Sequence, residues 1–571
     1  MTMNNANTEE ATARTPVLIV GGSLVGLSAA MFLRLRDVPV VLVERHRGGS
    51  LHPRAIGFTA RTLELFRAAG IGSQIPEVPA NTRLLRAKVE SLAGQHCEAT
   101  EWTPKANAPK EAPPAPVEYS PHIGASIAQD RLEPLLRARA VELGADLRLG
   151  TELVGFEQDE TGVTAHLRER DGHDGHDGRD YAVRADYLIA ADGNASPIRE
   201  QCGIARRGTG RLNTIRSVLF RAPLEEYLQE DIAQFEIEQA DFKAFLASYG
   251  DGRWALMFAD DVERDEAALQ AAVTRAIGRS DVAFEIITTG RWELSALIAE
   301  EFGCGRIFLA GDSAHTLPPT RGGFGANTGI QDAHNLAWKL AAVLRGDSTP
   351  TLLDTYSAER EPVAWQRLLQ TFARPDYAAY ATAENKAVPI IDDAAMEFGQ
   401  LYRSAGIIGA GAQLPPALRP DQWAGQPGTR APHLWIERAG ERTSTLDWFG
   451  QSWVLLAQQA EWATAAVAAG ERLGLALECV STETLASAEA DAVRAAYGLG
   501  MSGASLIRPD GYIAWRCADR PSDPLAALTA ALAQGAFAAP EDDAKSGKKS
   551  GDTIPIYEVK IGIVSPDYFP I

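Results

Sequence analysis

Residues 305–344 read GRIFLAGDSAHTLPPTRGGFGANTGIQDAHNLAWKLAAVL. The apolar run 306–310 predicts a buried strand, and Asp312 follows at its carboxyl end, where a strand delivers its next side chain to a crevice. The loop 318–325 contains Pro318, Pro319 and three glycines, so it is stiff and its backbone amides are accessible. A helical repeat follows, at Ala333, Leu336, Ala337, Leu340 and Leu344. The stretch therefore predicts a strand, a carboxylate and a loop that ends at a helix amino terminus, where an electron-rich ligand is favoured.

A second glycine loop lies near the start of the chain. The β-branched run 17–20 precedes Gly21-Gly22-Ser23-Leu24-Val25-Gly26, then come an apolar helix to residue 35 and a second β-branched run, 40–43, that ends at Glu44. This order matches the dinucleotide fingerprint: Gly21 makes the tight turn, Gly26 lets the helix pack on the strand, and Glu44 binds ribose hydroxyls. Ser23 replaces the middle glycine and offers a hydroxyl to the pyrophosphate. Arg45 and Arg54, just past the second strand, are candidates for adenine, ribose and phosphate contacts.

The composition is that of an ordinary globular protein of two or three domains, with 571 residues, 45% hydrophobic and 23% charged. The net charge of −20 disfavours nucleic acid and anionic membranes as partners. No apolar run is long enough to span a bilayer, and the first residues lack the features of a secretory signal. The five cysteines show no zinc or redox spacing, which favours isolated thiols in the cytoplasm.

The middle of the chain repeats the pattern of a strand that ends at an acid. Gln129 begins a helix, residues 146–190 read as strands, and the last of these strands ends at Asp192 and Gly193. The Asp-Gly-His tract at 171–178 is interpreted as a polar hairpin tip, so we expect no metal site there. Between residues 209 and 291, strand-like pieces separated by polar helices predict an inserted, mostly antiparallel sheet that roofs a substrate site.

The region after residue 415 predicts a separate thioredoxin-like unit. Its pattern is strand 433–437, strand 453–457, helix 461–472, strand 475–480, a hairpin over 506–516 and helix 524–533. The redox cysteine pair is missing, so we expect a scaffold or a homodimer contact rather than redox chemistry. Residues 541–571 read as a linker and a tail whose apolar end pairs as an edge strand.

Taken together, GGSLVG with Glu44, the strand end at Asp192-Gly193 and the GDSAH loop resemble the single-component FAD-dependent aromatic hydroxylases, the flavoprotein monooxygenases of the 4-hydroxybenzoate and phenol hydroxylase type. The resemblance covers residues 15–370, and the C-terminal region is similar to the thioredoxin-like appendage of the larger members. FGANTGIQDAHNLAWKL most resembles the branch that hydroxylates polycyclic aromatic polyketides, such as tetracenomycin and anthracycline hydroxylases. Arg321 lengthens the loop after Pro-Pro-Thr relative to that family.

The resemblance implies an α/β fold, α+β overall. A Rossmann-like FAD-binding domain would comprise 15–80, 120–205 and 292–370, with the substrate domain inserted as 81–119 and 206–291. A helical connection, 371–414, would lead to the thioredoxin-like domain, 415–540. The implied contacts with non-covalent FAD are Gly21, Ser23, Gly26, Glu44, Arg54, Gln129, Asp192, Gly193, Asp312, Pro319, Gly325, Ala326 and Asn327. Of these, Asp192 and Gly193 match a motif implicated in NADPH binding as well.

The mechanism that the resemblance implies begins with reduction of FAD by NADPH or NADH. Oxygen then adds at flavin C4a, and the hydroperoxide passes a hydroxyl group to a polycyclic phenol or quinone, in antibiotic biosynthesis. No catalytic base is assigned from the residues. The alternatives are Baeyer–Villiger insertion into a polyketide quinone, hydroxylation of a simple phenol or hydroxyphenylpropionate in aromatic degradation, and a flavin-bound redox sensor or scaffold without enzymatic activity.

Overall fold

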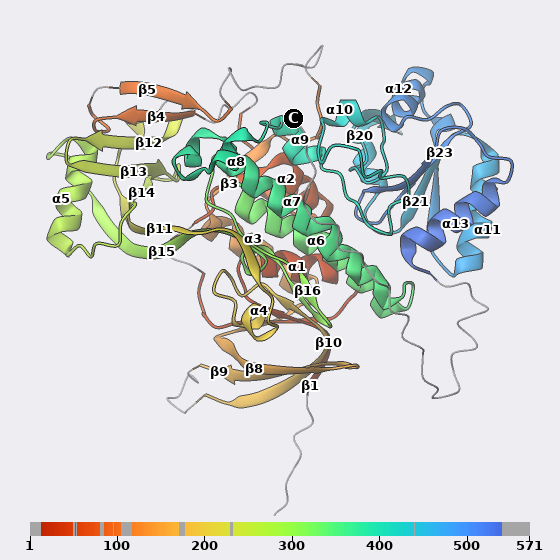
Figure 1. Cartoon of the computed structure of the whole chain (residues 1–571), viewed down its shortest axis with the longest axis horizontal. Coiled ribbons are helices and arrows are strands. Elements are labelled where there is room, and N and C mark those ends of the chain that lie inside the picture. Colours follow the sequence, from red (N-terminus) through yellow and green to blue (C-terminus); the bar gives the residue numbers. More distant parts are fainter. Residues whose placement is uncertain are drawn as a thin grey trace, which may run out of the picture.

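The computed structural model describes residues 13–49, 52, 54–79, 85–94, 96–103, 117–170, 178–228, 232–438 and 440–538. The polar tract at 171–177, residues 104–116, and the linker and tail at 541–571 lie outside this described part. Three sheets surround two long helices, α6 (Phe324–Arg345) and α7 (Asp354–Ala373), which lie side by side at the centre of Figure 1.

The first sheet is the parallel sheet that the glycine turn predicts. It has the order β16-β17-β10-β1-β2-β7, and neighbouring strands from β17 to β7 are parallel. Its strands are β1 (Ala13–Val20), β2 (Val40–Glu44), β7 (Asp146–Leu149), β10 (Asp180–Ala190), β16 (Gly303–Cys304) and β17 (Ile307–Leu309). A β-hairpin, β8 (Thr151–Asp159) and β9 (Gly162–Glu169), joins it through an antiparallel contact with β10. Helices α1 (Leu24–Arg34) and α3 (Gln129–Glu142) pack together, and α1 also packs on α6. This crossover pattern brings the carboxyl ends of β1, β2, β10 and β17 to one edge.

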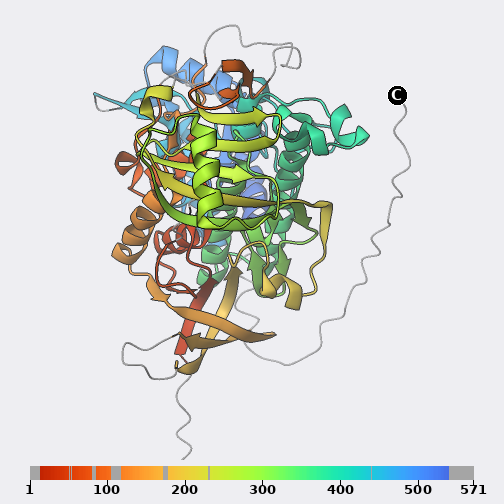
Figure 2. The same ribbon diagram turned by 90° about the vertical axis from the view of Figure 1, so that its left-hand side faces the viewer.

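The second sheet is mostly antiparallel, as expected, with the order β18-β15-β11-β14-β13-β12-β4-β5. Its strands are β4 (Leu85–Val89), β5 (His96–Glu101), β11 (Arg206–Arg221), β12 (Ile232–Gln239), β13 (Phe242–Ser248), β14 (Arg253–Phe258), β15 (Glu285–Ala299) and β18 (His315–Thr316). One helix, α5 (Glu266–Ile277), lies across its outer face, towards the viewer in Figure 2. The prediction of polar helices between the strands is therefore wrong, except for α5 and a short turn, because residues 232–248 form the hairpin β12–β13.

The C-terminal unit has a four-stranded sheet with the order β22-β21-β23-β24. Strands β21 (Trp453–Ala457) and β22 (Leu477–Ser481) are parallel, while β23 (Ala504–Ile507) and β24 (Ile513–Cys517) are antiparallel to their neighbours. Three helices accompany it: α11 (Ala460–Leu473), α12 (Ser487–Tyr497) and α13 (Pro524–Ala536). This arrangement is thioredoxin-like. The sequence missed α12, and the first expected strand instead forms a separate hairpin, β19 (Trp435–Arg438) with β20 (Glu441–Ser444).

Short elements complete the connections. They are β3 (Gly57–Thr59), β6 (Gly124–Ser126), α2 (Ala60–Ala68), α4 (Pro197–Gln201), α8 (Ala383–Ala387), α9 (Asp393–Phe398), α10 (Pro420–Trp423) and the 3-10 helices η1 (Gly72–Gln74), η3 (Glu225–Tyr227), η4 (Gly311–Ser313), η5 (Pro350–Leu353), η6 (Pro375–Tyr380), η7 (Thr445–Trp448) and η8 (Thr482–Thr484). Among the described residues, no helix has the length and apolar character needed to cross a bilayer.

Candidate cofactor and substrate site

The glycine turn after β1 is built by close approaches that no side chain would permit. A Cβ on Gly21, whose φ is +110°, would lie 2.2 Å from Ala191 O, and one on Gly26 would lie 1.9 Å from Gly21 O. These approaches pack the turn and the start of α1 closely against the ends of β1 and β10. The first turn of α1 has no acidic residue, and its first N–H groups have no intrahelical partners. This helix end suits an anion such as a pyrophosphate.

Glu44 closes the turn from the neighbouring strand. Its Oε2 accepts a hydrogen bond from Gly22 N at 2.7 Å, and its Oε1 accepts one from His46 N at 2.8 Å. The carboxylate is thus held at the end of β2 with lone pairs remaining for hydroxyl donors. Arg45 and Arg54 lie nearby on the surface, both exposed, and Arg45 Nε donates to His46 Nε2 at 3.1 Å.

Ser23 and Gln129 meet at the amino end of α3, together with an acid that the sequence analysis missed. Ser23 Oγ donates to Glu133 Oε1 at 2.6 Å, while Gln129 Nε2 donates to Ser23 Oγ at 3.0 Å and to Glu133 Oε1 at 2.7 Å. Gln129 Oε1 also accepts from Arg54 N at 3.3 Å. Glu133 is 3% exposed. Its position four residues after Gln129, on the same helix face, is the signal that could have identified it.

Asp192 and Gly193 adjoin the glycine turn at the end of β10. Burial raises the pKa of Asp192, and its Oδ1 is buried without a hydrogen-bond partner among the described residues. Gly193 has a φ of +89°, and a Cβ there would meet nothing within 4 Å. An unpaired buried acceptor next to open backbone is the environment that a ligand hydroxyl would complete.

The Gly311-Asp312 turn, in η4, is held by a buried charge network that the sequence did not reveal. Asp332 Oδ2 accepts from Gly311 N at 3.3 Å and contacts His315 Nε2 at 2.6 Å, and Arg360 Nε donates to Asp332 Oδ1 at 2.7 Å. Burial alone would raise the pKa of Asp332, but the charges of Arg360 and His315 hold it below the usual value. The sequence signal is a charged residue among the buried positions of α6, which also include Asn335 and Lys339.

The loop 318–323 leads into α6, whose first turn contains Gly325, Ala326 and Asn327. Gly323, the N-cap residue before α6, has a φ of +60°, and the first turn of the helix has no acidic residue. The Asn327 side chain is 1% exposed; its Nδ2 donates to Gly57 O at 3.1 Å, and its Oδ1 accepts from Thr59 N at 3.0 Å. The Asn327 side chain therefore holds β3 against the start of α6. The backbone amide of Asn327 lies in the first turn of the helix. Pro319 O accepts from Tyr377 OH at 2.8 Å.

The second sheet has a second, mostly apolar face on the side opposite α5. Val218, Phe220, Trp254 and Leu256 pack in the cluster beneath α5, so their alternating neighbours lie on the other side. We call this side the inner face; its residues, paired across β11, β14 and β13, are Ser217, Leu219, Ala255, Met257, Phe245 and Ala247.

Two contacts border the inner face. His52, from the segment after β2, lies 2.8 Å from Ser217 Oγ through its Nε2, and the guanidinium of Arg86 lies 4.7 Å from the centre of the Phe245 ring. The inner face is therefore bounded on one side by His52, from the segment after β2, and on the other side by the guanidinium of Arg86.

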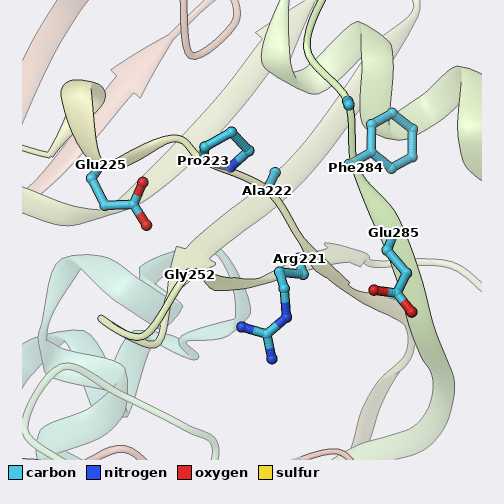
Figure 3. A pocket seen from close by; sticks show the side chains of 8 residues that line it. Arg221, Ala222, Pro223, Glu225, Gly252, Phe284 and Glu285 are labelled. Carbon is cyan, nitrogen blue, oxygen red and sulfur yellow. The ribbon is translucent and has the colours of Figure 1, made fainter.

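A separate recess of about 540 Å³ lies at the outer ends of β11 and β15. Figure 3 shows Arg221, Glu225 and Glu285 around it, with the Phe284 ring. None of its lining residues belongs to the expected cofactor contacts, and its two carboxylates make it unsuitable for a polyanion. Within the described residues, no group of three or more His, Cys, Asp or Glu side chains could hold a metal ion.

The residues present fit FAD. Two helix amino termini free of acids, the unpaired Asp192 Oδ1 and the Glu44 carboxylate supply what a pyrophosphate, hydroxyl groups and an electron-rich ring require. The structure brings Gly21, Ser23, Gly26, Glu44, Gln129 and Asp192 around one turn, whereas Pro319, Gly325, Ala326 and Asn327 gather at α6. Their contacts with FAD stay a prediction.

Comparison with known proteins gives the family. Residues 14–371 match the model of the FAD binding domain, and residues 424–540 match the aromatic-ring hydroxylase C-terminal model. The chain is 40% identical to 4-methyl-5-nitrocatechol 5-monooxygenase of Burkholderia sp, over 90% of this chain and 96% of that protein. It is 38% identical to tetracenomycin B2 monooxygenase-dioxygenase of Streptomyces olivaceus, over 91% and 98%.

Solved structures agree with the sequence relatives. The crystal structure of aklavinone-11 hydroxylase in a ternary complex with FAD and aklavinone superimposes with a TM-score of 0.79 and 34% identity, covering 91% of this chain and 99% of that one. The family models and these relatives extend over the glycine turn, the GDSAH loop and the thioredoxin-like unit alike. The chain belongs to the FAD-dependent aromatic-ring hydroxylases.

Proposed function

We propose that this protein hydroxylates a polycyclic aromatic polyketide of the phenol or quinone type, with NADPH or NADH and O2 as co-substrates. The inner face carries this proposal. It is mostly apolar, with small residues at Ala247 and Ala255 and a hydroxyl group at Ser217, which suits a fused-ring substrate with one or more oxygen substituents. Relatives that act on tetracenomycins and aklavinone support the same substrate class.

The chemistry divides between cofactor and protein. Bound FAD supplies the redox chemistry, namely hydride acceptance from the nicotinamide and activation of O2. The protein supplies the amino termini of α1 and α6 for negative charge, an apolar inner face that excludes water, and the hydrogen bonds that orient the ring. A polyketide phenol is already acidic, so this proposal requires no strong base.

The test begins with the visible spectrum of purified protein and continues with a naphthacene-type phenol, NADPH and heavy oxygen. One labelled oxygen on a ring carbon of the product supports the proposal. A ring-expanded lactone would establish the Baeyer–Villiger alternative instead, and NADPH oxidation that no aromatic compound stimulates would favour a redox sensor.

A matched pair of variants locates the substrate. Met257→Trp fills the inner face, so we expect KM for the polycyclic phenol to rise about tenfold, the loss of one well-packed contact, with FAD affinity unchanged. Val154→Trp places the same ring at an exposed position of β8 in the first sheet, 46% accessible, and should change neither value. Equal effects of the two variants would remove the inner face from the substrate site.

A second candidate is hydroxylation of a single-ring catechol. The observation in its favour is the 40% identity with the nitrocatechol monooxygenase, which extends over 90% of this chain. Comparison of kcat/KM for 4-methyl-5-nitrocatechol and for the naphthacene-type phenol decides between the two, and a higher value for the catechol would replace the polyketide proposal.

A further inference from the structure

Arg321, expected as an insertion in the loop before α6, is buried. Its side chain and that of Asp376 are each 2% exposed, and Arg321 Nη2 lies 2.9 Å from Asp376 Oδ1. Arg321 Nε donates to the same oxygen at 3.1 Å, and its backbone N–H donates to Asp376 Oδ2 at 3.1 Å. One carboxylate thus holds both the backbone and the side chain of the residue at the centre of the loop 318–323.

The loop is held at a second point by the adjacent residue of η6. Tyr377 OH donates to Pro319 O at 2.8 Å, two positions before Arg321. Two consecutive residues of η6 therefore grip the loop that leads into α6, the helix whose first turn contains the expected flavin contacts Gly325, Ala326 and Asn327. η6 therefore holds this loop at two points, Pro319 and Arg321.

The same pair reaches the second sheet. Arg321 Nη1 donates to Thr100 O, and its Nη2 donates to Glu101 O at 3.2 Å, both at the end of β5. Trp102, the next residue, meets Phe324 of α6 ring edge to ring face with centroids 5.9 Å apart. The end of β5 is therefore docked on the loop and on the start of α6.

Asp376 also contacts the border of the inner face. Arg86 Nη1, on β4, lies 3.4 Å from Asp376 Oδ1, and the same guanidinium lies 4.7 Å from the Phe245 ring centre. Asp376 is thus shared by an arginine of the cofactor-side loop and an arginine of the substrate-side sheet. A buried carboxylate between two fixed guanidinium groups is confined to a small region, because a small displacement weakens its hydrogen bonds to them.

We propose that the Arg321–Asp376 pair is a positioning device, which sets the spacing between the loop 318–323 and the inner face and so places the substrate ring against the cofactor. This inference rests on the proposed function for its catalytic consequence. Its structural part, that Asp376 fixes the loop relative to β4 and β5, stands independently. Both residues act through the protein groups they contact, so we assign them as positioning residues.

The structural part is tested on the protein freed of FAD by amide hydrogen exchange. In Asp376→Asn, we expect the amides of residues 320–323 and 100–102 to exchange roughly tenfold faster, the effect of losing about one charged hydrogen bond. The matched control is Asp261→Asn, which breaks the exposed pairs of Asp261 with Arg216 and Arg291 on the same sheet and should leave these amides unchanged. Unchanged exchange in Asp376→Asn, or faster exchange spread evenly over the chain, would overturn the proposal.

The catalytic part is tested by the yield of product per NAD(P)H. Oxygen that is reduced without transfer leaves as hydrogen peroxide, in the balance NAD(P)H + H⁺ + O2 → NAD(P)⁺ + H2O2. We expect Asp376→Asn to lower the product yield and raise the peroxide yield by matching amounts, while the dissociation constant of FAD stays within about twofold. A yield equal to that of the wild type would refute the role in placing the ring.

Two milder variants keep the test decisive if Asp376→Asn does not fold. Tyr377→Phe removes only the bond to Pro319 O, and Arg321→Lys keeps the charge but loses the fork that reaches Thr100 and Glu101. Both should show intermediate exchange and intermediate peroxide yield. If the wild type forms no hydroxylated product with any aromatic compound, the proposed function fails, and the exchange result still judges the pair.

Discussion

Arg508 of the C-terminal unit donates to both carboxylate oxygens of Glu359 in α7, with Nη1–Oε1 at 2.6 Å and Nη2–Oε2 at 3.0 Å. The side chains of Arg508 and Glu359 are 2% and 0% exposed, and Lys339 Nζ, from α6, lies 2.9 Å from Glu359 Oε2. Burial opposes the charge on Glu359, yet Arg508 and Lys339 outweigh it and hold the pKa of Glu359 well below its usual value. The thioredoxin-like unit is thus attached through a buried ion pair to the helix pair at the centre of the molecule.

Removal of one partner of that pair should be costly. We predict that Arg508→Met lowers the free energy of unfolding by about 3–5 kcal/mol, because Glu359 and Asp510 lose their main buried cation. Urea unfolding followed by fluorescence measures it. Arg168→Met breaks the exposed Arg168–Asp180 pair and should have little effect. Equal losses in the two variants would contradict the prediction.

Acid should destabilise the protein through His433. Burial and the charge of Arg430 lower the pKa of His433 to about 4, while an unfolded histidine titrates near 6.5. The unfolded chain therefore binds the proton first, and stability falls as the pH drops from about 6.5 towards 4.

Between pH 7 and pH 5, we expect the free energy of unfolding to fall by roughly 2 kcal/mol less in His433→Gln than in the wild type. Urea unfolding at the two pH values tests this. His166→Gln, at an exposed position of β9, is the control. An unchanged difference between the two pH values in His433→Gln would disprove the assignment.

Gly26→Ala should abolish FAD retention. Alanine normally stabilises a helix by about 1 kcal/mol relative to glycine, but here its Cβ would lie 1.9 Å from Gly21 O, a backbone atom that cannot move without opening the turn. The ratio of flavin to protein absorbance after purification is the measurement, with circular dichroism to confirm folding. Gly48→Ala, where a Cβ would meet nothing within 4 Å, should retain wild-type FAD.

Glu44→Gln should weaken FAD binding without removing it. The amide can accept only one of the two backbone N–H groups, of Gly22 and His46, that the carboxylate accepts now. We predict that the dissociation constant of FAD rises about tenfold, the value of one charge-assisted hydrogen bond. Flavin fluorescence quenching measures it, and Glu157→Gln on the exposed edge of β8 should bind FAD as the wild type does.

The elements that the sequence predicted correctly are those with local signals. The turn at Gly21, the strand that ends before Asp312 and the long helix from Phe324 each follow from glycine positions, β-branched runs and helical spacing within about 20 residues. The hairpin β12–β13 was misread because its polar, partly exposed alternation resembles a helix surface until the partner strand is known. The missed helix α12 has a similarly weak apolar pattern.

The amino-acid sequence by itself determined the cofactor class, since a glycine turn between a strand and a helix can be read from neighbours along the chain. Only the tertiary structure decided which polar groups meet: Ser23 with Glu133 at a separation of 110 residues, Arg321 with Asp376 at 55, and Arg508 with Glu359 at 149. Such partners depend on where distant segments of the chain meet. The sequence alone does not distinguish these pairs from the many other possible pairs of arginines and acids. Burial selects among them, because an unpaired charge in the interior costs more than the folded state can tolerate.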